Sequence, residues 1–287
     1  MTLIPQETQL MDDRFAPGDR FTPDDLARIE SDTFIERVDY HDQIESTNTR
    51  AAALAADNTF ATADSPDDRS CVLVLADHQS AGRGRGANKW WSTRGALTFS
   101  VLIRPDALQL PTNRWPLISL TAGLAVCRAI ESLDKNLAAR LKWPNDVYVS
   151  GRKICGILVE AATGERGSIL LGIGLNVNNS ATNAPDDLRE KVIALSDVAE
   201  GKLRRIDVLV AILQQLAVRL DRLGSGTEGL SEEWRQRCLL TGRTVEIELP
   251  TRRLSGICRG IDADGALLVE TPTGPQRCLS GVVVRFD

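Results

Sequence analysis

The sequence RLKWPNDVYVSGRKICGILVE, residues 140–160, decides the fold of the larger part of the chain. Two apolar segments, Val147–Val149 and Lys153–Ala161, flank the dipeptide Ser150-Gly151, which is typical of a two-residue β-hairpin turn. Upstream of them, Pro144 ends another strand-like segment, because proline has no N–H group to donate to a sheet. The stretch therefore predicts neighbouring strands, with the Asn-Asp pair after the proline at the rim of a sheet.

Further strands and helices are predicted before and after residues 140–160. Further strands are expected at Cys71–Ala76, Ala96–Ile103 and Ser168–Val177, together with a strand-like run from Ile35 to Ile44. Helices are expected from Ser46-Thr47-Asn48, where Ser or Thr is a good N-cap, over Trp115–Leu133, over the amphipathic segment Ile206–Leu223 and around Trp234. This mixture of elements predicts an α+β fold.

The chain divides into three parts. Residues 1–34 are polar and charged, with at most a short helix at Asp24–Glu30, and we expect a partly disordered extension. After Gly242, short alternating strands separated by Gly, Asp and Pro predict a small all-β module, interpreted as a barrel. We therefore expect an extension at 1–34, an α+β domain at 35–237 and a β-barrel at 238–287.

The composition argues against several classes of protein. The 287 residues carry a net charge of −5, which does not suit a nucleic-acid-binding surface. The six cysteines are scattered and there are only two histidines, so neither a zinc site nor a disulfide framework is expected. The sequence shows no signal peptide and no apolar run of membrane-spanning length, so we expect a cytoplasmic protein without a membrane partner.

The loop Gly82-Arg83-Gly84-Arg85-Gly86 is the first candidate site. Glycines allow backbone N–H groups to approach an anion closely, and the two guanidinium groups offer paired donors to phosphate or carboxylate oxygens. Arginine–glycine runs also occur in RNA-binding tails and in ordinary surface loops. Because this run lies between two predicted buried strands, we interpret it as a folded anion-binding loop.

Three further motifs each have a structural and a functional interpretation. The segment Lys142-Trp143-Pro144-Asn145-Asp146 is either a strand end with an Asx-turn or a site at the rim of the sheet. Lys153 is either an edge lysine that prevents aggregation or a cation that meets an anionic ligand. The segment Gly172-Ile173-Gly174-Leu175-Asn176 is either a buried strand or a surface on which a flat ring can lie.

Taken in order, these motifs resemble the biotin–protein ligase family. The elements are Ser46-Thr47-Asn48, then Gln79 followed by AGRGR and a tryptophan, then KWPND, then RK-x-x-GILVE, then GIGLNVN and a small β-barrel. The resemblance spans residues 40–287. It implies a class II synthetase-like mixed-sheet catalytic domain with flanking helices, followed by an SH3-like β-barrel.

The resemblance also assigns the site residue by residue. Catalytic roles fall on Lys153, Arg83, Arg85 and Asp146, with Asp146 expected to orient or deprotonate an acceptor amine. Biotin-binding positions are Ser46, Thr47, Asn48, Gln79, Gly82, Arg83, Gly84, Arg85, Lys153 and Gly156. ATP-binding positions are Arg83, Arg85, Trp90, Lys142, Asn145, Lys153 and Asn176. Of these, Trp90 and Asn176 are expected at the adenine, and no residue is assigned to a metal.

The glycine-rich loop departs from the family pattern. The pattern GRGR-x-GR-x-W becomes GRGRGANKW at residues 82–90, so Asn88 stands where the family has an arginine and Ala87 where it has a glycine. Lys89 is a candidate for the missing charge. The property most affected is therefore the retention of a reactive intermediate, rather than activity itself.

The resemblance implies that the protein activates biotin with ATP and transfers it to a lysine of a biotin carboxyl carrier protein domain. The carboxylate of biotin attacks the α-phosphorus of ATP, and the carrier lysine then attacks the biotinyl-adenylate. Arg83, Arg85 and Lys153 are expected to offset the repulsion between the two anions. Mg²⁺ is expected to arrive on the phosphates of ATP, and the loop to close over the adenylate. A homodimer is compatible with this interpretation.

Three other functions compete with it. A biotin-responsive DNA-binding repressor would need a helix-turn-helix before the ligase, and residues 1–34 are too short and too acidic for one. The KWPND and AGRGR blocks argue against a lipoate or octanoate ligase. A non-catalytic biotin-binding module would release no pyrophosphate.

Overall fold

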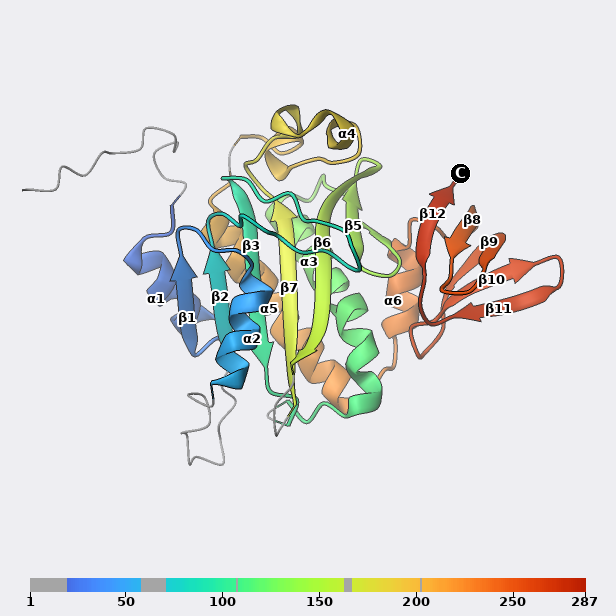
Figure 1. Ribbon diagram of the computed structural model, residues 1–287, viewed down its shortest axis with the longest axis horizontal. Coiled ribbons are helices and arrows are strands. Elements are labelled where there is room, and N and C mark those ends of the chain that lie inside the picture. Colours follow the sequence, from blue (N-terminus) through green and yellow to red (C-terminus); the bar gives the residue numbers. More distant parts are fainter. Residues whose placement is uncertain (1–19, 58–70, 107, 163–166, 202) are drawn as a thin grey trace, which may run out of the picture.

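The computed structural model describes residues 20–57, 71–106, 108–162, 167–201 and 203–287. A seven-stranded mixed sheet with helices on both faces forms the larger domain, and a five-stranded antiparallel sheet forms a C-terminal domain beside it (Figure 1). The predicted fold class, α+β with a separate small β domain, is confirmed.

The strands of the larger sheet are ordered β1-β2-β3-β7-β6-β5-β4. β1 and β2 run parallel, and every other neighbouring pair is antiparallel. The strands are β1 (Arg37–His41), β2 (Val72–Ala76), β3 (Ala96–Ile103), β4 (Arg140–Lys142), β5 (Asp146–Val149), β6 (Arg152–Ala162) and β7 (Ser168–Asn176). The predicted hairpin at Ser150-Gly151 joins β5 to β6.

Helices cover both faces of this sheet. In Figure 1, α3 and α5 pack together behind it and α2 lies in front. The α-helices are α1 (Pro23–Asp32), α2 (Thr47–Ala56), α3 (Ile118–Leu133), α4 (Asp186–Arg189), α5 (Arg205–Ser225) and α6 (Leu230–Arg237). Short 3-10 turns are present at Thr112–Leu117, Ala181–Asn183 and Leu195–Asp197.

The predicted elements are present, with shifts at their ends. The strand expected over Ile35–Ile44 is shorter, because only Arg37–His41 pairs with β2. The helix expected over Trp115–Leu133 begins as a 3-10 turn, since Pro116 lies inside that turn and cannot donate to an α-helical ladder. Ser46 caps α2 as predicted, and its hydroxyl accepts from a backbone N–H of the first turn.

The alternation of side chains along the strands separates the apolar residues into two layers. On the face that packs against α3 and α5, Leu97 and Phe99 of β3 are fully buried in the main core. On the opposite face, Leu102 of β3 joins Leu170 of β7 and Leu54 of α2 in a smaller cluster. α2 therefore covers one end of the second face, and the adjoining part of that face is available for a site.

Residues 20–34 are folded onto the larger domain. α1 is longer than the helix predicted at Asp24–Glu30, and a capping box between Thr22 and Asp25 stabilises its first turn. Ile29 of α1 is fully buried in the main core. The extension expected at 1–34 thus includes a packed helix, and residues 1–19 lie outside the described part of the chain.

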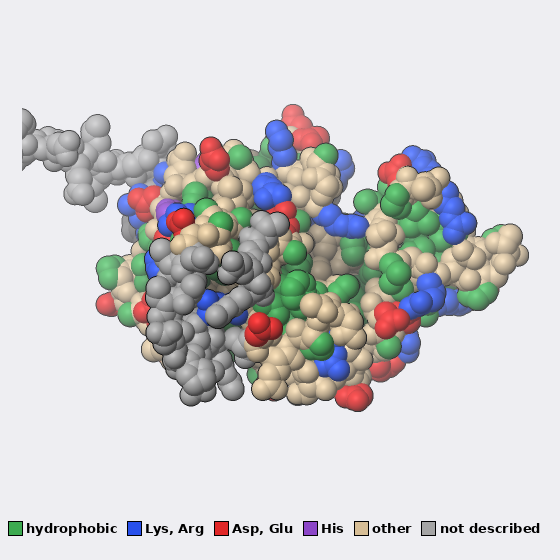
Figure 2. All heavy atoms as spheres, turned by 60° about the horizontal axis from the view of Figure 1, so that its bottom comes forward, with side chains coloured by type: hydrophobic (Ala, Val, Ile, Leu, Met, Phe, Trp, Pro, Cys, Tyr) green, Lys and Arg blue, Asp and Glu red, His purple; other side chains and the backbone are tan. Residues whose placement is uncertain are grey.

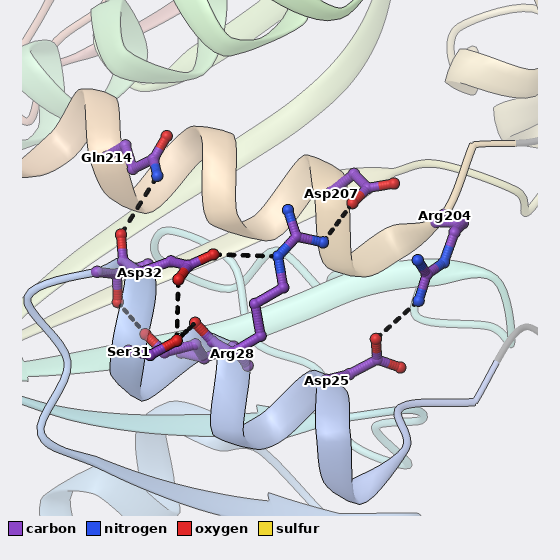
Figure 3. Close-up of polar contacts among 9 residues, drawn as sticks. Asp25, Arg28, Ser31, Asp32, Arg204, Asp207 and Gln214 are labelled. Atoms are coloured by element: carbon purple, nitrogen blue, oxygen red, sulfur yellow. Dashed lines mark hydrogen bonds and ion pairs between the residues drawn. The ribbon is translucent and has the colours of Figure 1, made fainter.

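Ion pairs attach α1 to α5 along one side (Figure 3). Arg28 donates to Asp207 at 2.6 Å, and Arg204 donates to Asp25 at 2.8 Å. Gln214, which lies further along α5, donates to the backbone carbonyl of Asp32 at the end of α1 at 3.2 Å. These contacts connect the N-terminal helix to the helix that covers the back of the sheet.

The C-terminal domain is an SH3-like sheet with strands ordered β11-β10-β9-β8-β12. The strands are β8 (Thr244–Glu248), β9 (Arg253–Ile261), β10 (Leu267–Thr271), β11 (Gly274–Cys278) and β12 (Val282–Phe286). The two end strands, β11 and β12, do not pair with each other among the described residues, so the barrel is open. Figure 2 shows this domain as a projecting lobe that carries Lys and Arg side chains.

Within the described part of the chain, one helical stretch is long and apolar enough to cross a membrane. It is Thr112–Leu133, and 67% of its most apolar window is buried inside the protein. Because α3 packs against both the sheet and α5, this stretch is the core helix of the larger domain.

Candidate functional site

A pocket of about 500 Å³ opens on the sheet face beside α2. Its walls are the start of α2, the glycine-rich loop, the KWPND segment, parts of β6 and β7, and the start of β12. The predicted site residues that line it are Ser46, Thr47, Asn48, Gln79, Arg83, Gly84, Arg85, Trp90, Lys142, Asn145, Asp146, Lys153 and Gly156. Motifs that are far apart in the sequence therefore meet around one cavity.

Glycines of β6 and β7 form the floor of this pocket. The antiparallel register places Gly156 opposite Gly174, and a Cβ atom at Gly174 would overlap the indole of Trp90. A Cβ atom at Gly172 would likewise overlap the side-chain amide of Asn48. The GIG segment thus allows close approach of a flat group, as predicted, and the group in this structure is Trp90 itself. The buried Nε1 of Trp90 has no partner among the described residues, so it can donate to a ligand.

The glycine-rich loop closes on itself as a narrow turn. The N–H of Trp90 donates to the carbonyl of Gly82 at 2.9 Å, and the N–H of Gly84 donates to the carbonyl of Asn88 at 2.8 Å. The side chain of Asn88 donates to the carbonyl of Arg85 at 2.9 Å. Gly82 thus supports the loop without lining the pocket, and Asn88, which departs from the family pattern, stabilises its turn.

Two cations of the pocket are paired with carboxylates. Nζ of Lys153 lies 2.5 Å from Oδ1 of Asp146. Nη2 of Arg83 lies 2.5 Å from Oε1 of Glu160. Glu160, the last residue of GILVE, was not predicted as a site residue. The period-two alternation of a strand would have placed it on the same face as Gly156.

The C-terminal domain contributes to the pocket through backbone atoms. Val282 and Val283 line one wall. Arg85 donates to the carbonyl of Gly281 at 2.6 Å, and Lys142 donates to the carbonyl of Val283 at 3.1 Å. No motif in the sequence indicates this contribution, because no polar side chain of β12 takes part in it.

Lys142 is a largely buried cation. Its ammonium lies 5.6 Å from the ring centre of Phe286 and 6.0 Å from that of Tyr148. Burial lowers the pKa of Lys142 below its ordinary value, Asp146 opposes this change, and Lys153 adds to it. An anionic ligand beside Lys142 would favour its charged form, so this part of the pocket suits phosphate.

Buried hydrogen-bonding groups gather where α2 begins. Thr47 donates to Oε1 of Gln79 through its N–H at 2.7 Å and through its hydroxyl at 3.1 Å. The hydroxyl of Ser100, a residue not predicted for the site, donates to Oδ1 of Asn48 at 2.5 Å and lies 2.7 Å from Oγ1 of Thr47. All four residues are buried. This end of the pocket therefore suits a ligand with its own donors and acceptors, rather than a plain apolar chain.

Besides Gly82, the predicted site residue Asn176 lies away from the pocket lining. Asn176, at the end of β7, is 2% exposed and donates to the carbonyl of Ile193 at 3.1 Å. Its Oδ1 accepts from Asn179 at 2.9 Å. The side chain thus stabilises the loop after β7, and its contact with adenine stays a prediction.

Comparison with known protein families gives matches in both domains. Residues 40–178 match the Biotin/lipoate A/B protein ligase family, and residues 240–285 match the Biotin protein ligase C terminal domain. The chain is 34% identical over 238 residues to the Biotin--[acetyl-CoA-carboxylase] ligase of Mycobacterium tuberculosis, which covers 82% of this chain and 83% of that relative. It is 32% identical over 256 residues to the Bifunctional ligase/repressor BirA of Bacillus subtilis, covering 88% and 75% of the two chains.

One solved structure has a similar fold over most of the chain. The Biotin protein ligase from Aquifex aeolicus in complex with biotin and ATP superimposes with a TM-score of 0.70 at 26% sequence identity. The match covers 88% of this chain and 98% of the other.

Proposed function

This chain belongs to the biotin–protein ligase family, and we propose that it activates biotin with ATP and transfers the biotinyl group to a lysine of a biotin carboxyl carrier protein. The observation that best supports this is the pocket, in which a cluster of cations adjoins a buried set of neutral donors and acceptors. The cations that line the pocket include Arg83, Arg85, Lys142 and Lys153. Biotin supplies a polar ring at one end and a carboxylate at the other, and ATP supplies the phosphates.

The ring of biotin is assigned to the start of α2. The ureido group needs buried partners, and the hydrogen-bonded set around Thr47 and Gln79 provides them. The carboxylate is assigned to the neighbourhood of Arg83 and Lys153, because both cations line the same pocket.

ATP is assigned to the side of the pocket near KWPND and β12. Arg85 and Lys142 are positioned there by carbonyls of the C-terminal domain and are the partners proposed for the phosphates. Trp90 offers an aromatic ring for the adenine. Asn145 is proposed to act through the backbone, since its amide donates to the carbonyl of Ile157 at 2.7 Å and links β5 to β6.

Mg²⁺ is proposed to enter as the ATP complex. Among the described residues, no group of three or more His, Cys, Asp or Glu side chains could hold a metal ion. The phosphates would therefore supply most of its ligands, as is usual for Mg²⁺ in ATP-dependent enzymes.

The two steps use the same cations in turn. A carboxylate oxygen of biotin forms a bond to the α-phosphorus, and the bond to pyrophosphate breaks. Arg83, Arg85 and Lys153 offset the repulsion between carboxylate and phosphate. When Lys153 turns to the anions, Asp146 loses its partner and is available to take a proton from the carrier ammonium. The amine then attacks the acyl carbon, and AMP leaves.

The test is incubation with ATP, Mg²⁺, biotin and a biotin carboxyl carrier domain, followed by mass measurement of the carrier. The expected result is a mass increase of one biotinyl group, with release of pyrophosphate. A carrier whose acceptor lysine is replaced by arginine should stay unmodified. No mass increase, or equal labelling with lipoate in place of biotin, would contradict the proposal.

A cytoplasmic location and a homodimer are also proposals. The six cysteines are free in the structure, and free thiols are typical of the reducing cytoplasm. ATP and carrier carboxylases are available in that compartment. Fractionation of cells and measurement of the mass in solution would test the two points separately.

Asn88→Arg is expected to slow the release of biotinyl-adenylate by roughly threefold to tenfold, because a guanidinium adds a charge-assisted donor over the bound phosphate. The gain is limited because the substitution removes the bond from Asn88 to the carbonyl of Arg85. The measurements are the adenylate dissociation rate and the labelling of lysines on bystander proteins. Asn88→Gln is the uncharged control. Equal release from Asn88→Arg and the parent would show that Lys89 or another group already closes the loop.

A further inference from the structure

A continuous set of hydrogen bonds joins the arginine of the loop to the polar end of the pocket. Its members come from α2, β3, β6 and the loop after β2. In order they are Arg83, Glu160, Asn48, Ser100, Thr47 and Gln79. The last four are at least nine-tenths buried. Glu160 is the one member with a negative charge.

Glu160 uses both of its carboxylate oxygens in this set. Oε1 accepts from Nη2 of Arg83 at 2.5 Å, and Oε2 accepts from Nδ2 of Asn48 at 2.9 Å. It reaches both partners because it lies on the pocket face of β6, on the same side as Gly156 and Leu158. The side chains of Glu160 and Arg83 are 27% and 48% exposed, so water screens part of the attraction between them.

A carboxylate can only accept hydrogen bonds, so Glu160 determines which way the amide of Asn48 points. With Nδ2 toward Glu160, Oδ1 of Asn48 faces Ser100 and accepts its hydroxyl proton at 2.5 Å. Ser100 is itself fully buried and does not line the pocket, so it acts on a ligand through Asn48 and Thr47, which do. Oε1 of Gln79 already accepts from the N–H of Thr47, so its amide nitrogen is left to donate to a ligand carbonyl.

Glu160 also balances the charge of Arg83. While this pair is made, the guanidinium attracts an incoming carboxylate less strongly than a free guanidinium would. A ligand must therefore gain binding energy at the ring end of the pocket as well. A ringless acid such as octanoate has the carboxylate and the apolar chain, but it cannot use the polar groups of Thr47, Asn48 and Gln79.

We propose that Glu160 is a positioning residue that makes the pocket selective for biotin over carboxylic acids without a ureido ring, an inference that rests on the proposed function. It orients the groups that meet the ring through Asn48. It also withholds the charge of Arg83 from acids that lack the ring. Removal of its charge should therefore affect the two kinds of acid in opposite directions.

The test compares Glu160→Gln with the parent in pyrophosphate release driven by biotin and by octanoate. Glutamine has the size of glutamate but no negative charge to pair with Arg83. Its amide can also donate to Asn48, which glutamate cannot do. The expected result is a KM for biotin about tenfold higher, because a charged hydrogen-bonding partner is lost. We expect kcat for biotin within about twofold of the parent and a higher kcat/KM for octanoate.

Ser100→Ala separates the two roles of Glu160. This substitution interrupts the set of hydrogen bonds between Asn48 and Thr47, but it leaves the ion pair between Arg83 and Glu160 in place. The KM for biotin should rise, because Asn48 and Thr47 lose the hydroxyl that holds their side chains in place, while kcat/KM for octanoate should stay at the parent value. A rise in octanoate turnover in this variant would contradict the role given to the charge of Glu160.

Glu131→Gln is the matched control. Glu131 pairs with Arg237 through both oxygens at 2.6 and 2.9 Å, its side chain is 23% exposed, and it lies outside the pocket. This variant should leave the turnover of both acids unchanged. A selectivity change there equal to that of Glu160→Gln would show a general effect of ion-pair loss and overturn the inference.

Two further outcomes would overturn the inference, and a third result bears on the proposed function. Equal losses for both acids in Glu160→Gln, or a fall in kcat with an unchanged KM, would reject the positioning role. If the parent itself shows no biotin-dependent turnover, the proposed function fails. If Glu160→Gln does not fold in a thermal scan, Glu160→Asp carries the test, because its shorter side chain keeps the charge but cannot reach both partners.

Discussion

Lys153→Ala is expected to lower biotin-dependent pyrophosphate release by about 30- to 1,000-fold. The loss of a charge-assisted contact to developing negative charge typically costs about 2–4 kcal/mol, and each 1.4 kcal/mol or so corresponds to a factor of ten. The structure places Nζ of Lys153 2.5 Å from Oδ1 of Asp146. The substitution therefore also leaves Asp146 without its partner, and its negative charge would repel both substrates. This second effect favours the upper part of the range.

The measurement is pyrophosphate exchange at saturating biotin and ATP, together with a thermal unfolding scan. The side chain of Lys153 is 31% exposed, so its truncation should leave little buried empty space and the protein should stay folded. Lys153→Arg keeps the charge and should keep part of the activity, while the exposed Lys135→Ala should behave like the parent. Near-normal exchange by a folded Lys153→Ala protein would rule out the role given to this lysine.

Much of the pocket could be predicted, because its polar side chains belong to short motifs at the ends of strands. Pro144 ends the pairing of β4, and the residues that follow it meet at the rim of the sheet. The hairpin at Ser150-Gly151 joins β5 to β6, and Lys153 meets Asp146 across it. Turn chemistry predicts the hairpin, but not the register shift between Val147 and Tyr148.

Other parts of the site depend on pairings between distant segments, which one sequence does not reveal. Ser100 reaches Asn48 only because β3 lies beside β7 on the face covered by α2. The contacts of Arg85 and Lys142 are made to carbonyls of the C-terminal domain, and a carbonyl has no side-chain signature. For the same reason the burial of Asn176 among the loops after β7 was not foreseen.

The packing of the N-terminal helix α1 also depends on residues that are distant in the sequence. Its sequence is acidic and follows several prolines, a composition that favours disorder when considered alone. Its stability comes from Ile29 in the main core and from the ion pairs of Arg28 and Asp25 with residues of α5. Those partners lie far along the chain, so only the folded arrangement makes the helix part of the domain.

Asp77→Ala is expected to reduce the free energy of unfolding of the larger domain by about 3–5 kcal/mol, because it removes one partner of a buried ion pair. Asp77 accepts from Arg205 at 2.6 Å, and the two side chains are 1% and 3% exposed. Arg205 also donates to the carbonyl of Ala96 at 3.0 Å and lies 4.6 Å from the ring centre of Phe21. Tyr40 donates to the second oxygen of Asp77 at 2.6 Å. The pair thus connects α5, β1, β2 and the residues before α1.

The loss should appear in urea unfolding as a lower midpoint with an unchanged slope. The partly exposed pair of Arg28 and Asp207, with side chains 38% and 41% exposed, is the control, and Asp207→Ala should cost less than about 1 kcal/mol. The double variant Asp77→Leu with Arg205→Met replaces both charges by apolar groups and should be more stable than Asp77→Ala, because both buried charges are removed together. If the double variant is no more stable, or if Asp77→Ala costs no more than Asp207→Ala, the instability does not come from breaking the buried ion pair.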